Sequence, residues 1–278
     1  MDALPRPGSR LDITPLQLPG PLAPLGARLY RPSDARQPLP ALLYLHGGGF
    51  VAGSLDEADA IACALAHQAG VAVLSVAYSL APRCPFPAAP EDAYAALVWL
   101  GSHGPHWGLD ARRLGVGGDD AGGSIAAALA LIARDRNGPA LAAQILIGPM
   151  LDPSMTLLGD PARLGSDLLP QTCAQRYAQY LPRPQARLHP YAAPLTSRRL
   201  HGLPPTYLAT ARCDVLHREA EHYASALIAA GVPTQITRFD VTHAGLLQHP
   251  PLLTELAAFL HQRLGAWGAP GHAILPSP

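Results

Sequence analysis

Short apolar runs alternate with longer stretches of good helix-forming residues along most of the chain. Apolar runs of four to six residues are typical of buried strands, and the longer stretches are typical of helices. The pattern predicts strands at 27–31, 41–45, 71–76, 113–117, 144–147, 206–210 and 234–239. It predicts helices at 58–68, 91–100, 124–133, 171–180, 218–230 and 251–264. Strands that alternate with helices indicate an α/β fold with a mostly parallel central sheet, flanked by helices on both faces.

Two segments interrupt this alternation. Residues 1–25 are rich in proline, and we expect them to be irregular or part of a small lid. Residues 151–200 also contain many prolines, and we expect them to form lid segments over the carboxyl ends of the strands, where such folds bind ligands. Residues 267–278 are expected to form a loose tail. The length of residues 1–278 suits a single domain that includes these segments.

Composition excludes several classes of function. Only 14% of the residues are charged and the formal net charge is zero, so nothing favours nucleic acid or an anionic membrane as a partner. The chain has no lysine, which excludes a Walker A lysine and a Schiff-base lysine. No signal-peptide pattern, membrane-length apolar run or metal-binding histidine motif is present. The four cysteines are scattered, and we expect reduced thiols in a cytoplasmic protein: Cys63, Cys84, Cys173 and Cys213.

The segment Gly118-Asp119-Asp120-Ala121-Gly122 lies between a predicted strand and a predicted helix. Its pattern is that of a nucleophile elbow, in which the nucleophile sits on a sharp turn between two glycines. A Cβ two residues before or after the nucleophile would collide with the neighbouring strand and helix, so glycine is needed there. Asp120 stands where a serine is usual. The alternative interpretation is a glycine-rich turn with two solvated aspartates.

A second glycine-rich segment, His46-Gly47-Gly48-Gly49-Phe50, directly follows the strand predicted at 41–45. Glycines allow backbone N–H groups to point into a cavity without side chains in the way, which suits an oxyanion hole. We predict that Gly48 and Gly49 supply two donors and that Ala121 in the elbow supplies the third. A flexible loop is the alternative.

Asp214 and His243 each follow the end of a predicted strand, so both can meet the elbow above the sheet. The chain order is nucleophile position, acid, histidine, as in α/β-hydrolases. Asp214 would then hold one imidazole nitrogen of His243 and leave the other as a general base. Taken singly, Asp214 could cap the next helix and His243 could be an ordinary turn histidine.

These motifs together resemble the hormone-sensitive-lipase family of α/β-hydrolases, in its bacterial carboxylesterase branch. The matching segments are 46–50, 78–82, 85–92, 118–119 with 121–123, 213–216 and 243–245. The resemblance implies an α/β-hydrolase fold with a small lid, and hydrolysis of short to medium acyl esters without metal or cofactor. Members of the family often pair through the last strand and final helix, so it also implies a homodimer.

Asp120 changes the expected chemistry. A carboxylate needs no general base near pH 7, and its attack on an ester would form an anhydride and expel a worse leaving group than itself. It could instead accept the oxyanion-hole N–H groups and pair with protonated His243. The first hypothesis is therefore a carboxylic ester hydrolase scaffold that is silenced or nearly silenced at the nucleophile.

Two alternatives stay open. One is a non-catalytic protein that binds a small ligand on the same fold. The other is a hydrolase of epoxides or alkyl halides that uses Asp120 as its nucleophile. Epoxide opening requires an acid in the lid, for which Tyr177 and Tyr180 are candidates by position.

Overall fold

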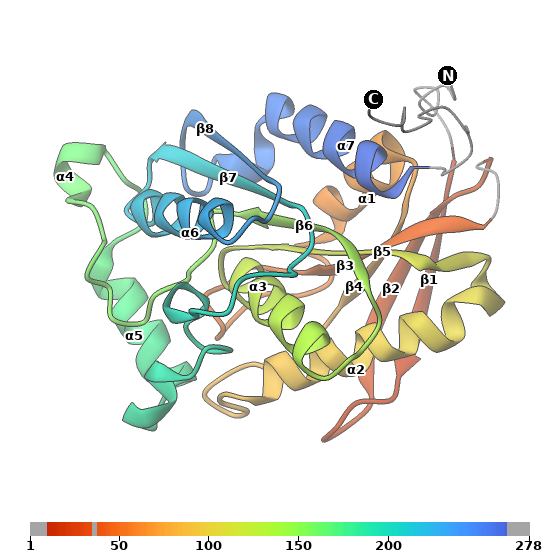
Figure 1. The fold of residues 1–278 in the computed structure, drawn as a ribbon, viewed down its shortest axis with the longest axis horizontal. Helices are drawn as coiled ribbons and strands as arrows, with labels where there is room; N and C mark the ends of the chain where they lie inside the picture. Colours follow the sequence, from red (N-terminus) through yellow and green to blue (C-terminus); the bar gives the residue numbers. More distant parts are fainter. Residues whose placement is uncertain (1–9, 35–37, 266–278) are drawn as a thin grey trace, which may run out of the picture.

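An eight-stranded sheet runs through the molecule, with helices on both of its faces (Figure 1). The computed structural model describes residues 10–34 and 38–265. The strands are β1 (Leu11–Leu18), β2 (Leu25–Pro32), β3 (Leu39–Leu45), β4 (Ala72–Val76), β5 (Leu109–Asp119), β6 (Leu141–Ile147), β7 (Thr206–Cys213) and β8 (Thr234–Thr242). Their order is β1-β2-β4-β3-β5-β6-β7-β8; β1, β2 and β4 pair antiparallel and all other neighbours pair parallel. The seven predicted strands and the mostly parallel sheet are confirmed.

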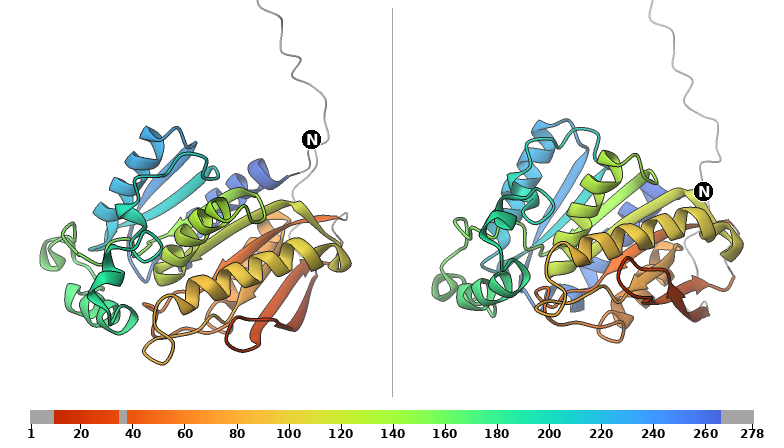
Figure 2. Two further views of the ribbon diagram at one scale, coloured as in Figure 1. Left: turned by 60° about the horizontal axis from the view of Figure 1, so that its bottom comes forward. Right: turned by 90° about the horizontal axis from the view of Figure 1, so that it is seen from below.

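The helices cover the two faces of the sheet in separate groups. They are α1 (Asp59–Ala69), α2 (Ala88–His103), α3 (Asp120–Asp135), α4 (Pro161–Leu164), α5 (Pro170–Tyr180), α6 (His217–Ala229) and α7 (Pro250–Leu264). Helices α1 and α7 contribute to one buried core, whereas α2, α3 and α6 contribute to the other (Figures 1 and 2). The six predicted helices are confirmed, and the short α4 was not predicted from the sequence.

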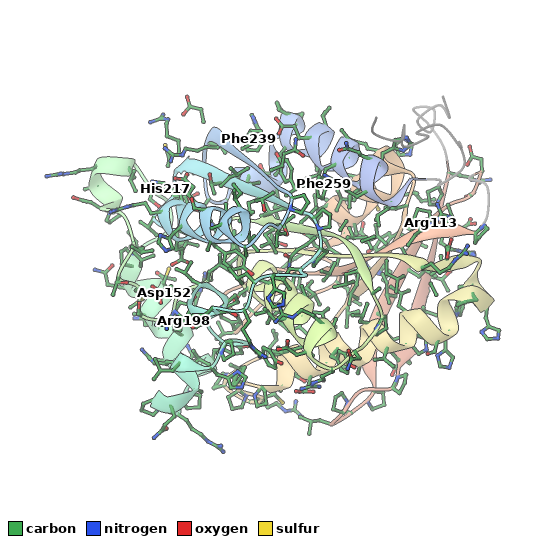
Figure 3. All side chains as sticks on the ribbon, in the orientation of Figure 1. Arg113, Asp152, Arg198, His217, Phe239 and Phe259 are labelled. Carbon is green, nitrogen blue, oxygen red and sulfur yellow. The ribbon has the colours of Figure 1, made fainter. Side chains whose placement is uncertain are left out.

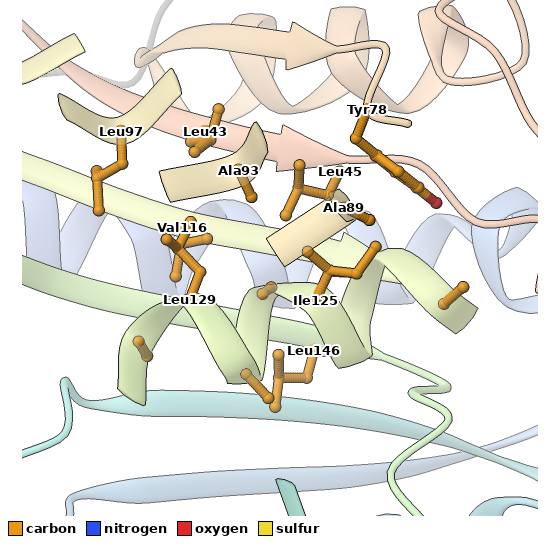
Figure 4. Packing of buried hydrophobic residues seen from close by; sticks show 14 of the residues in the cluster. Leu43, Leu45, Tyr78, Ala89, Ala93, Leu97, Val116, Ile125, Leu129 and Leu146 are labelled. Carbon is orange, nitrogen blue, oxygen red and sulfur yellow. The ribbon is translucent and has the colours of Figure 1, made fainter. Parts of the chain in front are cut away.

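Side chains along β3 show how the sheet separates these cores. All seven residues of β3 are buried, as expected of a strand covered on both faces. Leu43 and Leu45 face the core that contains Val116 of β5 and Ile125 of α3 (Figure 4). Tyr44, one position along, belongs to the opposite core with α1 and α7. On that side the Phe259 ring of α7, labelled in Figure 3, lies 5.7 Å from the Tyr207 ring of β7.

The prediction that residues 1–25 are irregular or part of a lid is wrong for residues 11–18. These residues form β1, which pairs antiparallel with β2 along its full length at the edge of the sheet. Pro15 lacks an N–H group, but an edge strand has one side without a partner and therefore tolerates proline. Residues 1–9 and the tail predicted at 267–278 lie outside the described residues.

The segment 151–200 contains short helices joined by irregular chain. Besides α4 and α5 it has two single-turn helices, η2 (Pro184–Leu188) and η3 (Pro194–Thr196). Together they lie at one end of the molecule (Figure 2), and Asp152 near the start of the segment lies on the same side (Figure 3). No helix in the described part of the chain is long and apolar enough to cross a membrane.

The turn between β5 and α3 requires a very close approach of three backbone segments. Strand β5 ends at Asp119 and α3 begins at Asp120, whose φ of 50° is in the left-handed region. A Cβ atom at Gly118 or Gly122 would overlap the carbonyl oxygen of Leu45 at the end of β3. The strand–turn–helix geometry predicted for the elbow is therefore present, and its two glycines are needed for steric reasons.

Replacing Gly122 with alanine should destabilise the fold. Its Cβ would meet the Leu45 carbonyl, a backbone atom that cannot move aside cheaply, so Gly122→Ala should cost about 2 kcal/mol or more. Urea denaturation followed by circular dichroism gives the free energy of unfolding. Gly26→Ala is the matched control, because its nearest neighbour is the Ala77 side chain at 3.9 Å. Equal stability of the two variants would contradict the assigned packing.

Candidate active site

The carboxylate of Asp120 is held by two successive backbone N–H groups. Its Oδ2 atom accepts hydrogen bonds from Gly49 at 2.7 Å and from Gly48 at 3.0 Å. Both glycines have positive φ angles, 110° at Gly48 and 60° at Gly49, which let their N–H groups point at the same oxygen. Ala121, the third predicted donor, follows Asp120 in the first turn of α3. The predicted oxyanion-hole segment and the nucleophile position therefore come together, with Asp120 only 6% exposed.

Asp214 and His243 complete a row of three side chains. Asp214 directly follows β7 and His243 directly follows β8, so both lie at the same edge of the parallel sheet. The Nδ1 atom of His243 is 2.8 Å from Oδ2 of Asp214, and its Nε2 atom is 3.8 Å from Oδ1 of Asp120. The backbone N–H of Leu216 donates to Oδ1 of Asp214 and fixes that carboxylate. The structure thus brings together the three residues that the sequence placed in one site.

The two flanking carboxylates stabilise a positive charge on His243. Burial opposes that charge, but the hydrogen bond and the charge of Asp214, followed by the charges of Asp120 and Asp119, raise the pKa of His243 to about 9. The imidazole is therefore protonated near neutral pH. The site therefore holds an imidazolium between two carboxylates. In this form His243 can donate a proton but cannot accept one.

Asp119, the other aspartate of the elbow, points toward the end of β3. The hydroxyl of Tyr44 donates to its Oδ1 atom at 2.7 Å. Burial raises the pKa of Asp119 to about 7, with the hydrogen bond from Tyr44 acting against the rise and the charge of Asp120 adding to it. The elbow therefore carries two adjacent carboxyl groups in different surroundings, and only that of Asp120 accepts the N–H groups of Gly48 and Gly49.

Asp167, in the segment that follows α4, binds the backbone of the histidine loop. Its Oδ1 atom accepts the N–H of His243 and its Oδ2 atom accepts the N–H of Ala244, both at 3.1 Å. The segment 151–200 therefore holds the loop that carries His243. Sequence reasoning missed Asp167, since no motif surrounds it and its partners are backbone groups far away along the chain.

A second residue of the segment 151–200, Arg176 on α5, was also missed. Its Nη1 atom lies 3.8 Å from Oδ2 of Asp120. The spacing of polar residues along the helix predicts a solvent-exposed face. It does not show that one arginine of that face reaches the elbow.

These side chains surround a cavity of about 430 Å³ above the elbow. Its walls include residues from the glycine loop, the elbow, the segment 151–200 and the histidine loop: His46, Gly47, Gly48, Glu57, Asp119, Asp120, Asp167, Leu168, Arg176, His243 and Leu246. Tyr177 and Tyr180 are not among the residues that line it; both are buried, and the Tyr180 ring stacks on Phe50 at 4.0 Å. Among the described residues, no cluster of three or more histidine, cysteine or acidic side chains is placed to hold a metal ion.

A buried carboxyl group on α6, that of Glu219, lies near Asp214. Oε1 of Glu219 accepts the backbone N–H of Leu151 at 2.6 Å, which joins α6 to the chain that follows β6. Burial raises the pKa of Glu219 well above its usual range, and the charges of Asp152 and Asp214 add to the rise against the hydrogen bond from Leu151.

A strand–helix elbow, followed along the chain by an acid and then a histidine at the ends of later strands, is the arrangement found in α/β-fold hydrolases. The family model for the alpha/beta hydrolase fold matches residues 42–246. The chain belongs to this family.

Curated relatives and solved structures agree with this assignment. The chain is 39% identical over 259 residues to the carboxylic ester hydrolase LipN of Mycobacterium tuberculosis, covering 89% of this chain and 66% of LipN. It is 42% identical over 225 residues to an ethyl acetate hydrolase of Pseudomonas putida, covering 79% of this chain and 70% of the relative. The chain thus spans roughly two thirds of the length of these relatives.

Among solved structures, a hyperthermophilic esterase from the archaeon Pyrobaculum calidifontis matches with a TM-score of 0.84 and 36% identity, over 92% of this chain and 84% of that one. The thermostable carboxylesterase EstE1, cloned from a metagenomic library, matches with a TM-score of 0.86 and 33% identity, over 92% and 91%. The fold predicted from the sequence is confirmed.

Removing the charge of Asp120 should lower the pKa of His243. Asp120→Asn takes away one of the negative charges that hold the pKa near 9, so the imidazole should titrate closer to 6.5. NMR titration of the His243 ring measures this value. Asp240→Asn is the control, since Asp240 is exposed and pairs with Arg212. An unchanged titration in the Asp120 variant would contradict the assigned contact.

The contact between His243 and Asp120 also makes the stability of the fold depend on pH. A folded-state pKa above the unfolded value stabilises the fold at low pH, and this contribution is lost as the pH rises through about 9. Between pH 7 and pH 9 the free energy of unfolding should therefore fall less in Asp120→Asn than in the original chain.

Replacing Asp167 with alanine should loosen the histidine loop. The variant loses two hydrogen bonds from backbone N–H groups to a carboxylate, each worth about 1.5–3 kcal/mol. Hydrogen exchange at the amides of His243 and Ala244 should then speed up about tenfold or more. Asp160→Ala is the matched control, because Asp160 accepts two N–H groups at the start of α4 in the same segment. Unchanged exchange would show that Asp167 does not hold the loop.

Proposed function

We propose that the chain is a carboxylic ester hydrolase scaffold for short to medium acyl esters, silenced or nearly silenced by Asp120 at the nucleophile position. The family and the named relatives support the ester hydrolase scaffold. The observation that carries the silencing is the position of the carboxylate, which accepts the N–H groups of both Gly48 and Gly49. These are the groups that an oxyanion would need in the reaction.

With a serine at position 120 the site has each part of an acyl-transfer mechanism. The serine oxygen attacks the ester carbonyl carbon while its proton passes to Nε2 of His243, and Asp214 stabilises the imidazolium that forms. The carbonyl oxygen becomes an oxyanion that accepts N–H groups from the glycine loop. His243 then gives its proton to the departing alcohol. Water next attacks the acyl-serine carbonyl carbon and gives a proton to His243, which passes it to the serine oxygen as that oxygen leaves.

Asp120 interferes with each of these steps. It has no hydroxyl proton to give. The pKa of about 9 keeps His243 protonated near pH 7, so the histidine cannot act as a general base there. Its carboxylate fills the space meant for the oxyanion. The tetrahedral adduct formed by its attack would collapse back to the ester and the free carboxylate, since a carboxylate leaves more readily than an alkoxide. Turnover of esters should therefore be very slow.

Small-ligand binding without catalysis is the second candidate. The cavity of about 430 Å³ lies within the usual size range of small-molecule sites. Epoxide or alkyl-halide hydrolysis by Asp120 has weaker support. The two tyrosines that could have supplied an acid for epoxide opening, Tyr177 and Tyr180, are not among the cavity-lining residues.

Replacing Asp120 with serine should restore ester hydrolysis. Asp120→Ser supplies the missing nucleophile and frees both the oxyanion hole and His243, so it should hydrolyse p-nitrophenyl esters at least about a thousandfold faster than the original chain. Release of p-nitrophenol from acetate to octanoate esters measures the rate. Asp120→Ala is the matched control, because it frees the same space without adding a nucleophile.

The other outcomes are equally informative. If neither protein turns over, the esterase proposal fails and small-ligand binding replaces it. If the original chain is active and the serine variant is not, Asp120 is a working nucleophile, and epoxides and alkyl halides become the substrates to test.

A further inference from the structure

Arg176 reaches the elbow from the lid helix α5 by crossing over Gly49. A Cβ atom at Gly49 would overlap the Cδ atom of Arg176, so the arginine stem occupies the space that a side chain at position 49 would take. Its guanidinium ends 3.8 Å from Oδ2 of Asp120, and 28% of the side chain is exposed. The bare glycine loop therefore serves two purposes: it presents its N–H groups and it makes room for this cation.

The Oδ2 atom of Asp120 marks where an oxyanion would sit. An oxyanion hole is recognised by donors about 2.7–3.1 Å from the position of the charged oxygen. The N–H groups of Gly49 and Gly48 lie 2.7 Å and 3.0 Å from this atom. The guanidinium of Arg176 therefore lies 3.8 Å from the oxyanion position.

Arg176 is the only arginine among the residues that line the cavity. The nearby carboxylates of Asp119 and Asp167 have other partners, the hydroxyl of Tyr44 and the N–H groups of the histidine loop. Arg176 forms an ion pair with Asp120. Once the carboxylate at position 120 is removed, the arginine faces an empty anion position.

We propose that Arg176, from the segment 151–200, supplies a positive charge beside the oxyanion hole and stabilises the oxyanion in addition to the backbone donors. This inference rests on the proposed function. With serine at position 120, the bond between the serine oxygen and the carbonyl carbon forms, the serine proton moves to His243, and the π electrons of the carbonyl move onto its oxygen. The negative charge then develops beside the Arg176 guanidinium. In the present chain the same guanidinium faces the Asp120 carboxylate.

The kinetic test uses Asp120→Ser as the parent and adds Arg176→Gln. An interaction that forms only in the transition state lowers kcat and leaves KM nearly unchanged. We expect kcat for p-nitrophenyl acetate to fall about tenfold to a hundredfold, with KM within about threefold. Arg176→Lys keeps a charge and should recover part of the loss. Arg183→Gln, an exposed arginine beyond the end of α5, is the matched control and should leave both constants unchanged.

A binding test separates this inference from the proposed function. Asp120→Ala empties the anion position without making a nucleophile, and acetate then stands in for the lost carboxylate. Acetate affinity, measured by NMR titration of the His243 ring, should be at least about tenfold weaker in Asp120→Ala/Arg176→Gln than in Asp120→Ala. This comparison holds even if Asp120→Ser has no esterase activity, which would overturn the proposed function alone.

Two results would overturn the role of Arg176. One is an unchanged kcat together with unchanged acetate affinity in the Arg176→Gln variants. The other is a rise in KM with kcat unchanged, which would assign Arg176 to ground-state binding of substrate instead.

Discussion

The contact between the first turn of α3 and the end of β3 is the constraint on which the site depends. Gly118 and Gly122 allow the elbow to touch the Leu45 carbonyl, and this places Asp120 directly beside the loop that begins at His46. A wider separation would take the side chain at position 120 out of reach of the N–H groups of Gly48 and Gly49. The close packing of α3 against the end of β3 thus fixes the position of the Asp120 carboxylate relative to the N–H groups of Gly48 and Gly49.

Contacts from a distant part of the chain complete that geometry. The segment between β6 and β7 contributes Asp167 to the backbone of the histidine loop and Arg176 to the carboxylate of the elbow. One contact holds the backbone of the histidine loop, and the other places a positive charge beside the glycine loop. The segment 151–200 is therefore part of the electrostatics of the site.

The sequence predicted those parts of the molecule that are determined locally or by strand order. Apolar runs located seven strands, and the glycines of the elbow located Asp120, because a turn this tight leaves a recognisable pattern. Strand β1 was missed since an edge strand tolerates a proline and exposes one side, which weakens its signal. Asp167 and Arg176 were missed for a different reason: their partners are far away in the chain, and long-range contacts of single polar residues leave no periodicity.

The position of Asp120 also has a thermodynamic consequence. Active sites usually keep donors and charges without partners until substrate arrives, and proteins lose stability by doing so. Here the carboxylate gives partners to two N–H groups, an imidazolium and a guanidinium within one cavity. The gain is confined to one side of the carboxylate: Oδ2 of Asp120 accepts both N–H groups, whereas its Oδ1 atom is buried without a hydrogen-bond partner and has only the ion-pair contact with His243.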